Sequence, residues 1–466
     1  MTAERIGFWA GLILFAAMLM LPAPGGMTTQ AWQVAALVLL MAVFWMTQAL
    51  PLTVTALLPF LALPAMGVMS ASDTAKEYYS PILFLILGGA FIALAIERTG
   101  LHRRVALAIL KRAGNGAAGL LFAFMIATAL LSMLISNTST ALIMVPIALA
   151  VLAAGGVKDG ETDGMAGALM MGIAFAASIG GLGTLVGSPT NAIAAGLINK
   201  QLGIEINFLS WMAFGLPVVL LSIPVCGLIL MRVQKMAAIP FRAAAAREAI
   251  GTPGPWSMAE KRLVPVIALV VLLWIMQPWL KDIMPEKSVT DGSIAILGSL
   301  LLFTIPDGSG RPLLVWKEAD RAPWGVIMMF GGGLALAAGI TQSGLAAWLG
   351  EALEPLSAVH PLIIAACVVA LVIVITEFAS NVATASGVIP VIAGLAAATG
   401  ADPWMLAMAA SMAASWGFML PSGTGPNAIA WASGHIALPR MLKAGFLLDL
   451  AGVPILIAIC WIVAGT

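Results

Sequence analysis

Charged residues are scarce in this sequence. Only 9% of its 466 residues are Asp, Glu, Lys or Arg, whereas soluble domains carry about 25%. Hydrophobic residues make up 61% of the chain, and its mean hydropathy is +1.05. A net charge of +1 gives no reason to expect a nucleic-acid partner. The composition therefore predicts an all-α polytopic membrane protein surrounded by the lipid bilayer.

Cysteine is also rare, and catalytic clusters are missing. The three cysteines, Cys226, Cys367 and Cys460, are scattered through apolar segments without the spacing of a metal or redox site. We interpret them as packing residues. The sequence has no His/Asp/Glu or Cys/His cluster that would support metal or nucleophilic chemistry. An enzyme is therefore the least favoured class.

Long apolar runs dominate what remains. A helix needs roughly 20 residues to cross a bilayer, and runs of this size predict about eleven crossings. The first run follows Arg5 and leads directly into another, so we expect a retained signal anchor. Two longer stretches, 116–155 and 358–397, need a separate explanation. The other runs lie near residues 6–22, 31–48, 51–68, 81–97, 165–199, 208–231, 263–280, 292–306, 324–341, 404–435 and 445–463.

The chain repeats itself. The motif Ser-Asn-Thr at 136–138 recurs 244 residues later as Ser-Asn-Val at 380–382, and the same offset matches Ser132 with Thr376. A chain built from two copies of one unit explains these matches. The offset also matches Gly88 and Gly100 with Gly332 and Gly344.

Each copy has a second polar segment. Residues 187–192 read Gly-Ser-Pro-Thr-Asn-Ala, and residues 423–428 read Gly-Thr-Gly-Pro-Asn-Ala. Gly and Pro at this density inside an apolar run unwind a helix and free backbone carbonyl groups to face a cavity. Small polar clusters in two repeated apolar units are typical of a transporter whose site lies where the repeats meet.

Charge predicts the topology. Lys and Arg concentrate in 98–112 and 232–262, which the positive-inside rule places in the cytoplasm. The counterpart of the first segment, 342–356, has Glu351 and Glu354 but no Lys or Arg, so we expect it outside. The repeats are then inverted. Five crossings per repeat after one extra crossing satisfy this scheme, with a cytoplasmic N-terminus and an external C-terminus.

The same topology requires 116–155 to begin and end on the cytoplasmic side. We therefore predict a re-entrant hairpin with the 136–138 motif near its tip. A second hairpin over 358–397 enters from outside, with 380–382 near its tip. The alternative, one long tilted helix in each stretch, would break the charge pattern. The basic segment 232–262 is expected to be a cytoplasmic linker.

The hairpin motifs are suited to a small alkali cation. Ser132 and Ser136 are four residues apart, as are Thr376 and Ser380, so we expect each pair on one helix face. Hydroxyls, Asn oxygens and freed carbonyls are hard, neutral ligands. Such residues also commonly form hydrogen bonds between membrane helices without binding an ion. The twofold repetition of the whole set favours one sodium site per repeat.

An anionic substrate would fit beside these cations. Helices that begin after the hairpin tips and the breaks carry free N–H groups and a partial positive charge. No Lys, Arg or His lies in the hairpin motifs or in the ten residues before Gly187 or Gly423. An anion would be neutralised mainly by helix ends and bound cations, which gives a physical reason for coupling.

Glu377 is the only acidic residue that we expect deep in a membrane segment. It could tune a cation site, or it could lie exposed on its hairpin arm, and the sequence does not separate these. We expect Glu377→Gln to leave transport largely intact. His435 is interpreted as an interfacial residue rather than a proton relay.

At these motifs the chain resembles the divalent anion/sodium symporters, the dicarboxylate and citrate transporters often called INDY. The resemblance rests on the paired Ser-Asn motifs, on Thr-Glu-Phe at 376–378 and on both breaks, and it covers nearly the whole chain. It implies an eleven-span plasma-membrane homodimer whose scaffold domain holds the dimer contact and supports an elevator-like transport domain. The implied parts are scaffold 1–112 and 263–356, transport 113–231 and 357–466, and linker 232–262.

The resemblance also implies site residues. The first sodium site would use Ser132, Ser136, Asn137 and the carbonyl of Gly187. The second would use Thr376, Ser380, Asn381 and the carbonyl of Gly423. Substrate carboxylates would meet Ser136, Asn137 and Thr138 on one side, and Ser188, Ser380, Asn381, Val382 and Thr424 on the other.

Two departures from the family pattern affect substrate choice. Val382 stands where Thr is usual, which removes a hydroxyl, and Gly425 stands where Pro is usual. We predict sodium-driven import of a di- or tricarboxylate such as succinate, malate or fumarate, with citrate and sulfate left open. Sodium-independent exchange would require fixed positive side chains in place of sodium, and the motifs lack them. A cation/proton antiporter and a channel are the remaining alternatives.

Overall fold

The computed structural model describes residues 3–114, 116–285, 288–399 and 401–465. These residues form helices and their connections, and no β-strand occurs among them. Eight of the described helices are long and apolar enough to cross a bilayer, and several shorter apolar helices accompany them. The all-α polytopic membrane fold is therefore confirmed.

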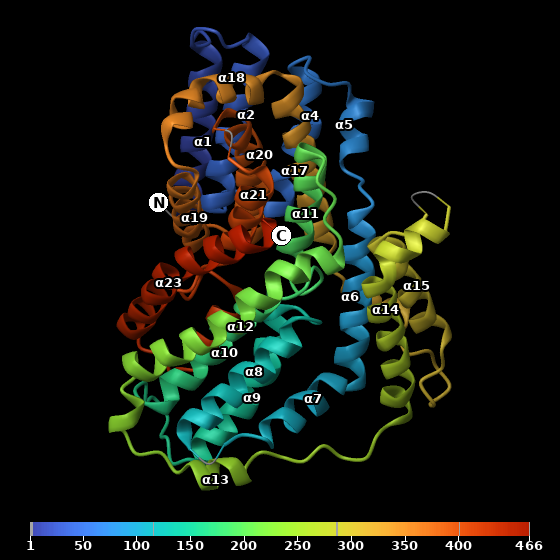
Figure 1. The fold of residues 1–466 in the computed structure, drawn as a ribbon, viewed down its shortest axis with the longest axis vertical. Helices are drawn as coiled ribbons and strands as arrows, with labels where there is room; N and C mark the ends of the chain where they lie inside the picture. Colours follow the sequence, from blue (N-terminus) through green and yellow to red (C-terminus); the bar gives the residue numbers. More distant parts are fainter. Residues whose placement is uncertain (1–2, 115, 286–287, 400, 466) are drawn as a thin grey trace.

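The helices repeat in the order that the sequence offsets predict (Figure 1). One helix, α1 (Ala3–Met20), precedes the repeats. The first repeat contains α2 (Thr29–Thr47), α3 (Leu52–Thr55), α4 (Leu58–Ala65), α5 (Ala71–Glu77), α6 (Ile82–Thr99), α7 (Leu101–Leu110), α8 (Ala117–Ser132), α9 (Asn137–Ala154), α10 (Met165–Gly181), α11 (Pro189–Leu202) and α12 (Phe208–Val233). The basic linker contains η1 (Met236–Ala238) and α13 (Ala243–Glu248). The second repeat contains α14 (Met258–Ile283), α15 (Asp291–Thr304), α16 (Trp316–Ala319), α17 (Trp324–Gln342), α18 (Leu345–Leu353), η2 (Glu354–Ala358), α19 (Pro361–Phe378), α20 (Asn381–Thr399), α21 (Pro403–Ala413), α22 (Gly425–Ala432) and α23 (Leu438–Ala464).

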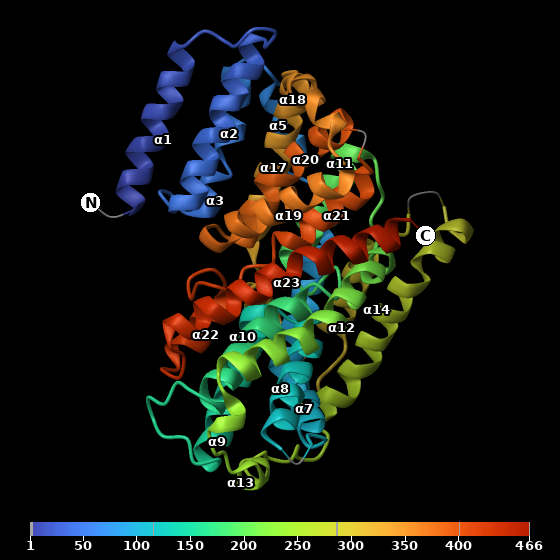
Figure 2. The same ribbon diagram turned by 60° about the vertical axis from the view of Figure 1, so that its left-hand side comes forward.

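Both long apolar stretches are helical hairpins. In the first, α8 ends at Ser132, α9 begins at Asn137, and the two arms contact each other. In the second, α19 ends at Phe378 and α20 begins at Asn381. The alternative of one long tilted helix is wrong, because each stretch is broken in the middle. Figures 1 and 2 show α8 and α9 in the lower half of the molecule and α19 and α20 in the upper half.

Each repeat also contains one broken helix. α10 ends at Gly181 and α11 begins at Pro189, while α21 ends at Ala413 and α22 begins at Gly425. Counting each broken helix and the α3–α4 pair as one crossing gives the eleven crossings expected from the sequence. The crossings are α1, α2, α3–α4, α6, α10–α11, α12, α14, α15, α17, α21–α22 and α23.

The two repeats are interlocked by exchanged contacts. α6 of the first repeat packs on α15 of the second, and α17 of the second packs on α3, α4 and α5 of the first. The hairpins and broken helices exchange partners in the same way, because α9 contacts α22 and α20 contacts α11. Each repeat therefore completes the core of the other, and we do not expect either half to fold alone.

Ion pairs join segments that the charge pattern places on one side. At one end, Arg98 pairs with Asp307, and Arg104 Nε lies 2.7 Å from Glu260 Oε1. The Arg98 guanidinium also holds the pKa of the Asp307 carboxyl below its usual range. Because the linker ends beside these contacts, at Glu260, we call this the basic end (98–104, 232–262 and 305–323).

The opposite end has its own ion pairs. Lys200 Nζ lies 2.9 Å from Glu77 Oε2, and Lys281 Nζ lies 3.4 Å from Glu205 Oε2. These pairs are exposed and contribute little to stability. They do agree with the predicted topology, because each pair joins two segments that are both expected on the external side.

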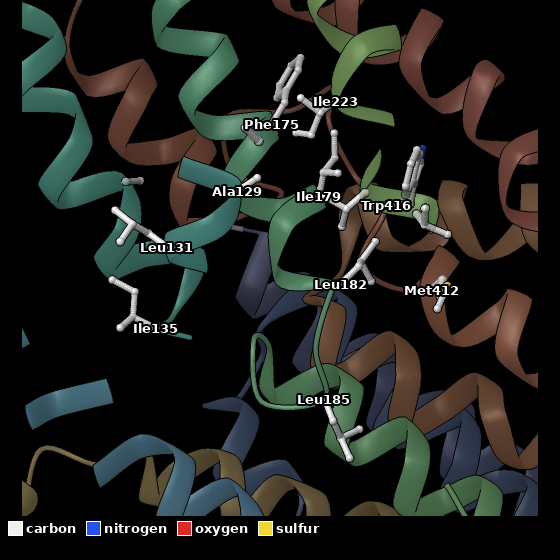
Figure 3. Packing of buried hydrophobic residues seen from close by; sticks show 14 of the residues in the cluster. Ala129, Leu131, Ile135, Phe175, Ile179, Leu182, Leu185, Ile223, Met412 and Trp416 are labelled. Atoms are coloured by element: carbon white, nitrogen blue, oxygen red, sulfur yellow. The ribbon is translucent and has the colours of Figure 1, made fainter. Parts of the chain in front are cut away.

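An apolar layer surrounds the broken helices. Phe175 on α10 meets Phe418 after α21, with ring centroids 5.2 Å apart, and Trp416 stacks edge-on to Phe418 at 5.4 Å. Figure 3 shows Leu182 and Leu185 along the segment that joins α10 to α11. These side chains are fully buried. The breaks therefore lie in the protein core rather than against lipid.

Two equivalent glycines allow the exchanged helices to meet. A Cβ atom on Gly88 would lie 2.6 Å from the Cβ of Ala295, and one on Gly332 would lie 2.2 Å from the carbonyl oxygen of Ala56. Both contacts are far shorter than side chains tolerate. The Gly88/Gly332 match in the sequence therefore reflects the same close helix contact in both repeats.

We expect Gly332→Ala to lower the thermal stability of the purified protein. Overpacking of this kind costs about 1–3 kcal/mol, and the clash is with a backbone oxygen that cannot rotate away. The matched control is Gly350→Ala on α18, where no atom lies within 4 Å of the added methyl group. Equal Tm values for the two variants, measured by fluorescence in detergent, would contradict the close contact.

Candidate functional site

The hairpin tips are helix N-caps. Ser136 precedes α9, and its Oγ accepts a hydrogen bond from the backbone N–H of Ser139 at 3.1 Å. Ser380 precedes α20 in the same way, accepting from the N–H of Ala383 at 3.2 Å. Ser132 ends the preceding arm, so the expectation that Ser132 and Ser136 share one helix face is wrong. The same correction applies to Thr376 and Ser380, because a turn separates the two helices.

A cluster of oxygen atoms lies behind the first tip. Ser132 Oγ is 2.7 Å from Asn137 Oδ1 and 2.7 Å from the carbonyl oxygen of Ala177. A hydroxyl has one proton and cannot donate to both. The same end of the Asn137 amide also faces the carbonyl oxygens of Ala177 and Gly187, at 3.2 and 3.3 Å. Either the amide NH2 group or a cation must therefore occupy the centre of these oxygens.

The second repeat builds the same cluster. Thr376 Oγ1 is 3.0 Å from Asn381 Oδ1 and 2.7 Å from the carbonyl oxygen of Ala414. Ala414 is the counterpart of Ala177, and both precede a break. Gly423 lies beside this cluster, since a Cβ on it would be 3.6 Å from the carbonyl oxygen of Glu377. The structure thus brings together Ser132, Asn137 and Gly187 in one repeat, and Thr376 and Asn381 in the other, where Gly423 lies next to Glu377.

An asparagine bonds carbonyl groups at each of the two breaks. Asn191 Nδ2 donates to the carbonyl oxygens of Gly181 at 2.7 Å and Thr184 at 2.8 Å. Asn427 Nδ2 donates to the carbonyl oxygen of Leu420 at 3.0 Å. Each asparagine thereby satisfies carbonyls that the unwound helix has released. Both residues were predicted in the breaks from the sequence, but this role was not.

Glu377 holds the second break to its hairpin. Its carboxylate accepts hydrogen bonds from the backbone N–H groups of Phe418, Met419 and Leu420, at 2.5, 2.8 and 3.1 Å. Its side chain is only 4% exposed, so the interpretation of an exposed arm residue is wrong. The carboxylate satisfies the donor side of the unwound segment, as the asparagines satisfy the acceptor side.

Asp449 on α23 is a second deep acidic residue, which the sequence analysis missed. It is 7% exposed, and neither carboxylate oxygen has a hydrogen-bond partner among the described residues. It lies close enough to Glu377 for the two carboxyl groups to interact. Glu377 is therefore not the only acid in the membrane core. An Asp in an otherwise apolar last span was the available signal.

His435 is buried, and its imidazole ring has a hydrogen-bond partner. Its Nδ1 atom lies 2.8 Å from the carbonyl oxygen of Glu161, in the connection that follows the first hairpin. Arg440 contacts the same connection, because Nη2 is 3.2 Å from Asp163 Oδ1. His435 thus joins two connections at the basic end of the molecule.

A cavity of about 330 Å³ opens beside the first tip and the first break. It contains two predicted substrate residues, Ser136 and Ser188, together with Gly187. It also contains Ser139, Glu97 and Arg321, which the sequence analysis did not select. The other predicted substrate residues do not line this cavity: Asn137, Thr138, Ser380, Asn381, Val382 and Thr424.

The remaining predicted residues lie at contacts between the repeats. Thr138 faces the start of α22, where a Cβ on Gly425 would lie 2.4 Å from Thr138 Oγ1. Gly425 thus leaves room for the tip of the first hairpin. Val382 packs against apolar residues at the second tip instead of adding a hydroxyl there. Thr424 caps α22, accepting from the N–H of Asn427 at 3.3 Å.

The fold and the paired clusters define a membrane transport protein built from two inverted repeats. The family model described as "Sodium:sulfate symporter transmembrane region" matches residues 3–465, and the chain belongs to that family. It is 37% identical to a sodium-dependent dicarboxylate transporter, SdcS, of Staphylococcus saprophyticus over 98% of this chain and 91% of that protein. It is 38% identical to SdcS of Staphylococcus aureus strain MRSA252 over 99% and 91%.

Two solved structures share the fold at low sequence identity. One is MtrF of Neisseria gonorrhoeae, with a TM-score of 0.61 and 11% identity over 98% of this chain and 94% of that one. The other is the YdaH transporter of Alcanivorax borkumensis, with a TM-score of 0.57 and 16% identity over 99% and 97%. These likenesses concern the fold alone.

We expect Glu377→Gln to destabilise the protein. A neutral amide accepts more weakly and turns an NH2 group toward backbone donors, at a cost of about 2 kcal/mol. The Tm of the purified variant should fall below that of the wild type. The control is Glu351→Gln on the exposed face of α18. A Glu377→Gln protein as stable as this control would show that the three hydrogen bonds contribute nothing.

Proposed function

We propose that this protein is a sodium-coupled secondary transporter that imports dicarboxylates such as succinate, malate or fumarate. The observation that carries the proposal is the pair of equivalent oxygen clusters, one beside each break. The printed names of the Staphylococcus relatives, at 37–38% identity over nearly the whole chain, support both sodium dependence and the dicarboxylate class.

Sodium fits the donors that are present. Each cluster offers a hydroxyl, an amide oxygen and backbone carbonyl oxygens, with no sulfur or imidazole. Such neutral oxygen ligands suit a hard cation and would not retain zinc or copper. Site 1 would use Ser132, Asn137 and the Gly187 carbonyl, and site 2 would use Thr376, Asn381 and the Gly423 carbonyl. Ser136 and Ser380 would complete the sites from the caps.

The substrate would bind where the tips and breaks converge. Ser136, Asn137 and Thr138 would form one side of this region, and Ser188 joins them because it lines the same cavity as Ser136. Ser380, Asn381, Val382 and Thr424 would form the other side. The N-termini of α9 and α11 are at the cavity and offer N–H groups to a carboxylate. A bound sodium ion behind each tip would stabilise the anion, so sodium and substrate would favour each other's binding.

The cavity supports an alternating-access cycle. One wall comes from α6 and residues 321–323, within the proposed scaffold (1–112 and 263–356), and the other from the proposed transport parts (113–231 and 357–466). The second tip instead packs against the scaffold, because Ala383 and Val382 join the cluster of α2, α17 and α18. With the basic end in the cytoplasm, this arrangement corresponds to an inward-facing state of an elevator.

We also propose a homodimer through the scaffold in the plasma membrane.

Proton coupling is the second candidate. It is favoured by Glu377 and Asp449, because two neighbouring carboxyl groups in a buried site cannot both be charged without a cation. Sodium symport is favoured over proton coupling because the oxygen clusters occur twice, whereas the acidic pair has no counterpart in the first repeat. A pH-sensitive dye inside vesicles separates the two, since only proton coupling acidifies or alkalinises the lumen during uptake.

Purified protein in liposomes should accumulate labelled succinate only under an inward sodium gradient. A potassium gradient of the same size is the control for the membrane potential and osmolarity. Uptake that is indifferent to sodium would overturn the coupling. Thermal stabilisation across succinate, citrate and sulfate would then identify the preferred anion, because a ligand that binds the native state raises Tm.

Ser132→Ala and Thr376→Ala should each raise the sodium concentration for half-maximal stabilisation by about tenfold, because each removes one ligand worth roughly 1.4 kcal/mol. Thr128→Val is the matched control, since Thr128 is one turn earlier on α8 and bonds only the carbonyl of Phe124 on its own helix. Thr376→Ser should behave like the wild type. If Thr128→Val weakens sodium binding as much as Ser132→Ala, the effect comes from packing and the assigned ligands are wrong.

A further inference from the structure

Arg321 is the one Lys or Arg side chain among the residues that line the cavity. It lies in the short connection between α16 and α17, at the basic end of the scaffold. Its neighbours hold the backbone in place, because Ala322 is buried and Pro323 precedes α17. Arg321 could not be selected from local sequence patterns, because it lies about 130 residues from the break that it approaches in space.

The Arg321 guanidinium has few protein partners. Its Nε donates to the carbonyl oxygen of Glu318 at 3.4 Å, and neither Nη group bonds any described residue. Nearby arginines differ in this respect. Arg98 and Arg311 are held by carboxylates of Asp307 and Glu318. Arg321 therefore keeps its two-pronged donor face available for a ligand.

The opposite wall of the cavity carries the complementary groups. Ser136, Ser139 and Ser188 place hydroxyls there, and α9 and α11 begin beside them. Ser136 and Ser139 already bond each other, with 2.9 Å between their Oγ atoms. A single carboxylate can be satisfied by this wall alone. A dianion would have a second carboxylate pointing across the cavity, toward the scaffold.

We propose that Arg321 forms an anion subsite at the cytoplasmic mouth of the cavity and binds the second carboxylate of a dianionic substrate. This inference rests on the proposed function and adds a counter-charge that the tips and breaks do not supply. Because Arg321 belongs to the scaffold, it would meet the substrate only when the transport domain faces the cytoplasm. Glu97 is the one carboxylate among the residues that line the cavity. Its negative charge weakens the attraction between Arg321 and the anion, so the anion is retained briefly and then released.

The test measures substrate affinity separately on the two faces of the membrane. Right-side-out and inside-out vesicles report the KM for labelled succinate outside and inside, at fixed sodium. Arg321→Gln should raise the cytoplasmic KM about tenfold, as expected when one charge-assisted carboxylate pair is lost. The external KM and the sodium dependence should not change. Arg321→Lys should keep part of the affinity, because it retains the charge but not the fork.

Lys317→Gln is the matched control. It makes the same charge change four residues away, on an exposed side chain outside the cavity lining. An unchanged cytoplasmic KM for Arg321→Gln, or equal increases on both faces or in Lys317→Gln, would overturn the subsite. If the wild type shows no sodium-driven succinate transport, the proposed function itself fails and the subsite falls with it. Normal wild-type transport with an unaffected Arg321→Gln variant rejects the subsite alone.

Discussion

Backbone groups released at the two broken helices must find partners inside the protein, because the bilayer core offers none. The structure meets this constraint with specific side chains. Asn191 donates to the carbonyl oxygens of Gly181 and Thr184, and Asn427 donates to that of Leu420. Glu377 accepts hydrogen bonds from three N–H groups in the second break. The carbonyl oxygens of Ala177 and Ala414 lie 2.7 Å from the hairpin hydroxyls of Ser132 and Thr376. The proposed cation sites are thus a direct consequence of how the breaks are satisfied.

The two repeats solve the same problem with different chemistry. In the first, Thr184 of the break donates to the carbonyl oxygen of Met133 in the hairpin at 2.5 Å. In the second, the equivalent positions are Leu420 and Glu377, and the hydrogen bond runs from the backbone N–H of Leu420 to the carboxylate. This difference brings a buried charge to one repeat only. Val382 and Gly425 also depart from the symmetry of the repeats, so the two halves are not interchangeable.

Sequence patterns predicted the parts of this protein that depend on local chemistry. The offset between 136–138 and 380–382 identified both hairpins, because capping serines and short polar motifs interrupt an apolar run whatever surrounds them. Gly and Pro marked both breaks for the same reason. The prediction that Ser132 and Ser136 share a helix face was wrong, because helical spacing was extended across a turn. The position of Glu377 could not be predicted, since its donors lie about 40 residues further along the chain.

By itself, the sequence determined the membrane class, the inverted repeats and the residues that interrupt the helices, because hydropathy, charge bias and capping act over short stretches of chain. Tertiary structure decided which of those residues meet. Exchange of helices between the repeats brings Thr138 to Gly425 and Arg321 to the first hairpin tip. Packing of α23 on α19 within the second repeat brings Glu377 to Asp449. These meetings depend on packing between segments separated by roughly 70 to 290 residues, and no local pattern encodes contacts at that range.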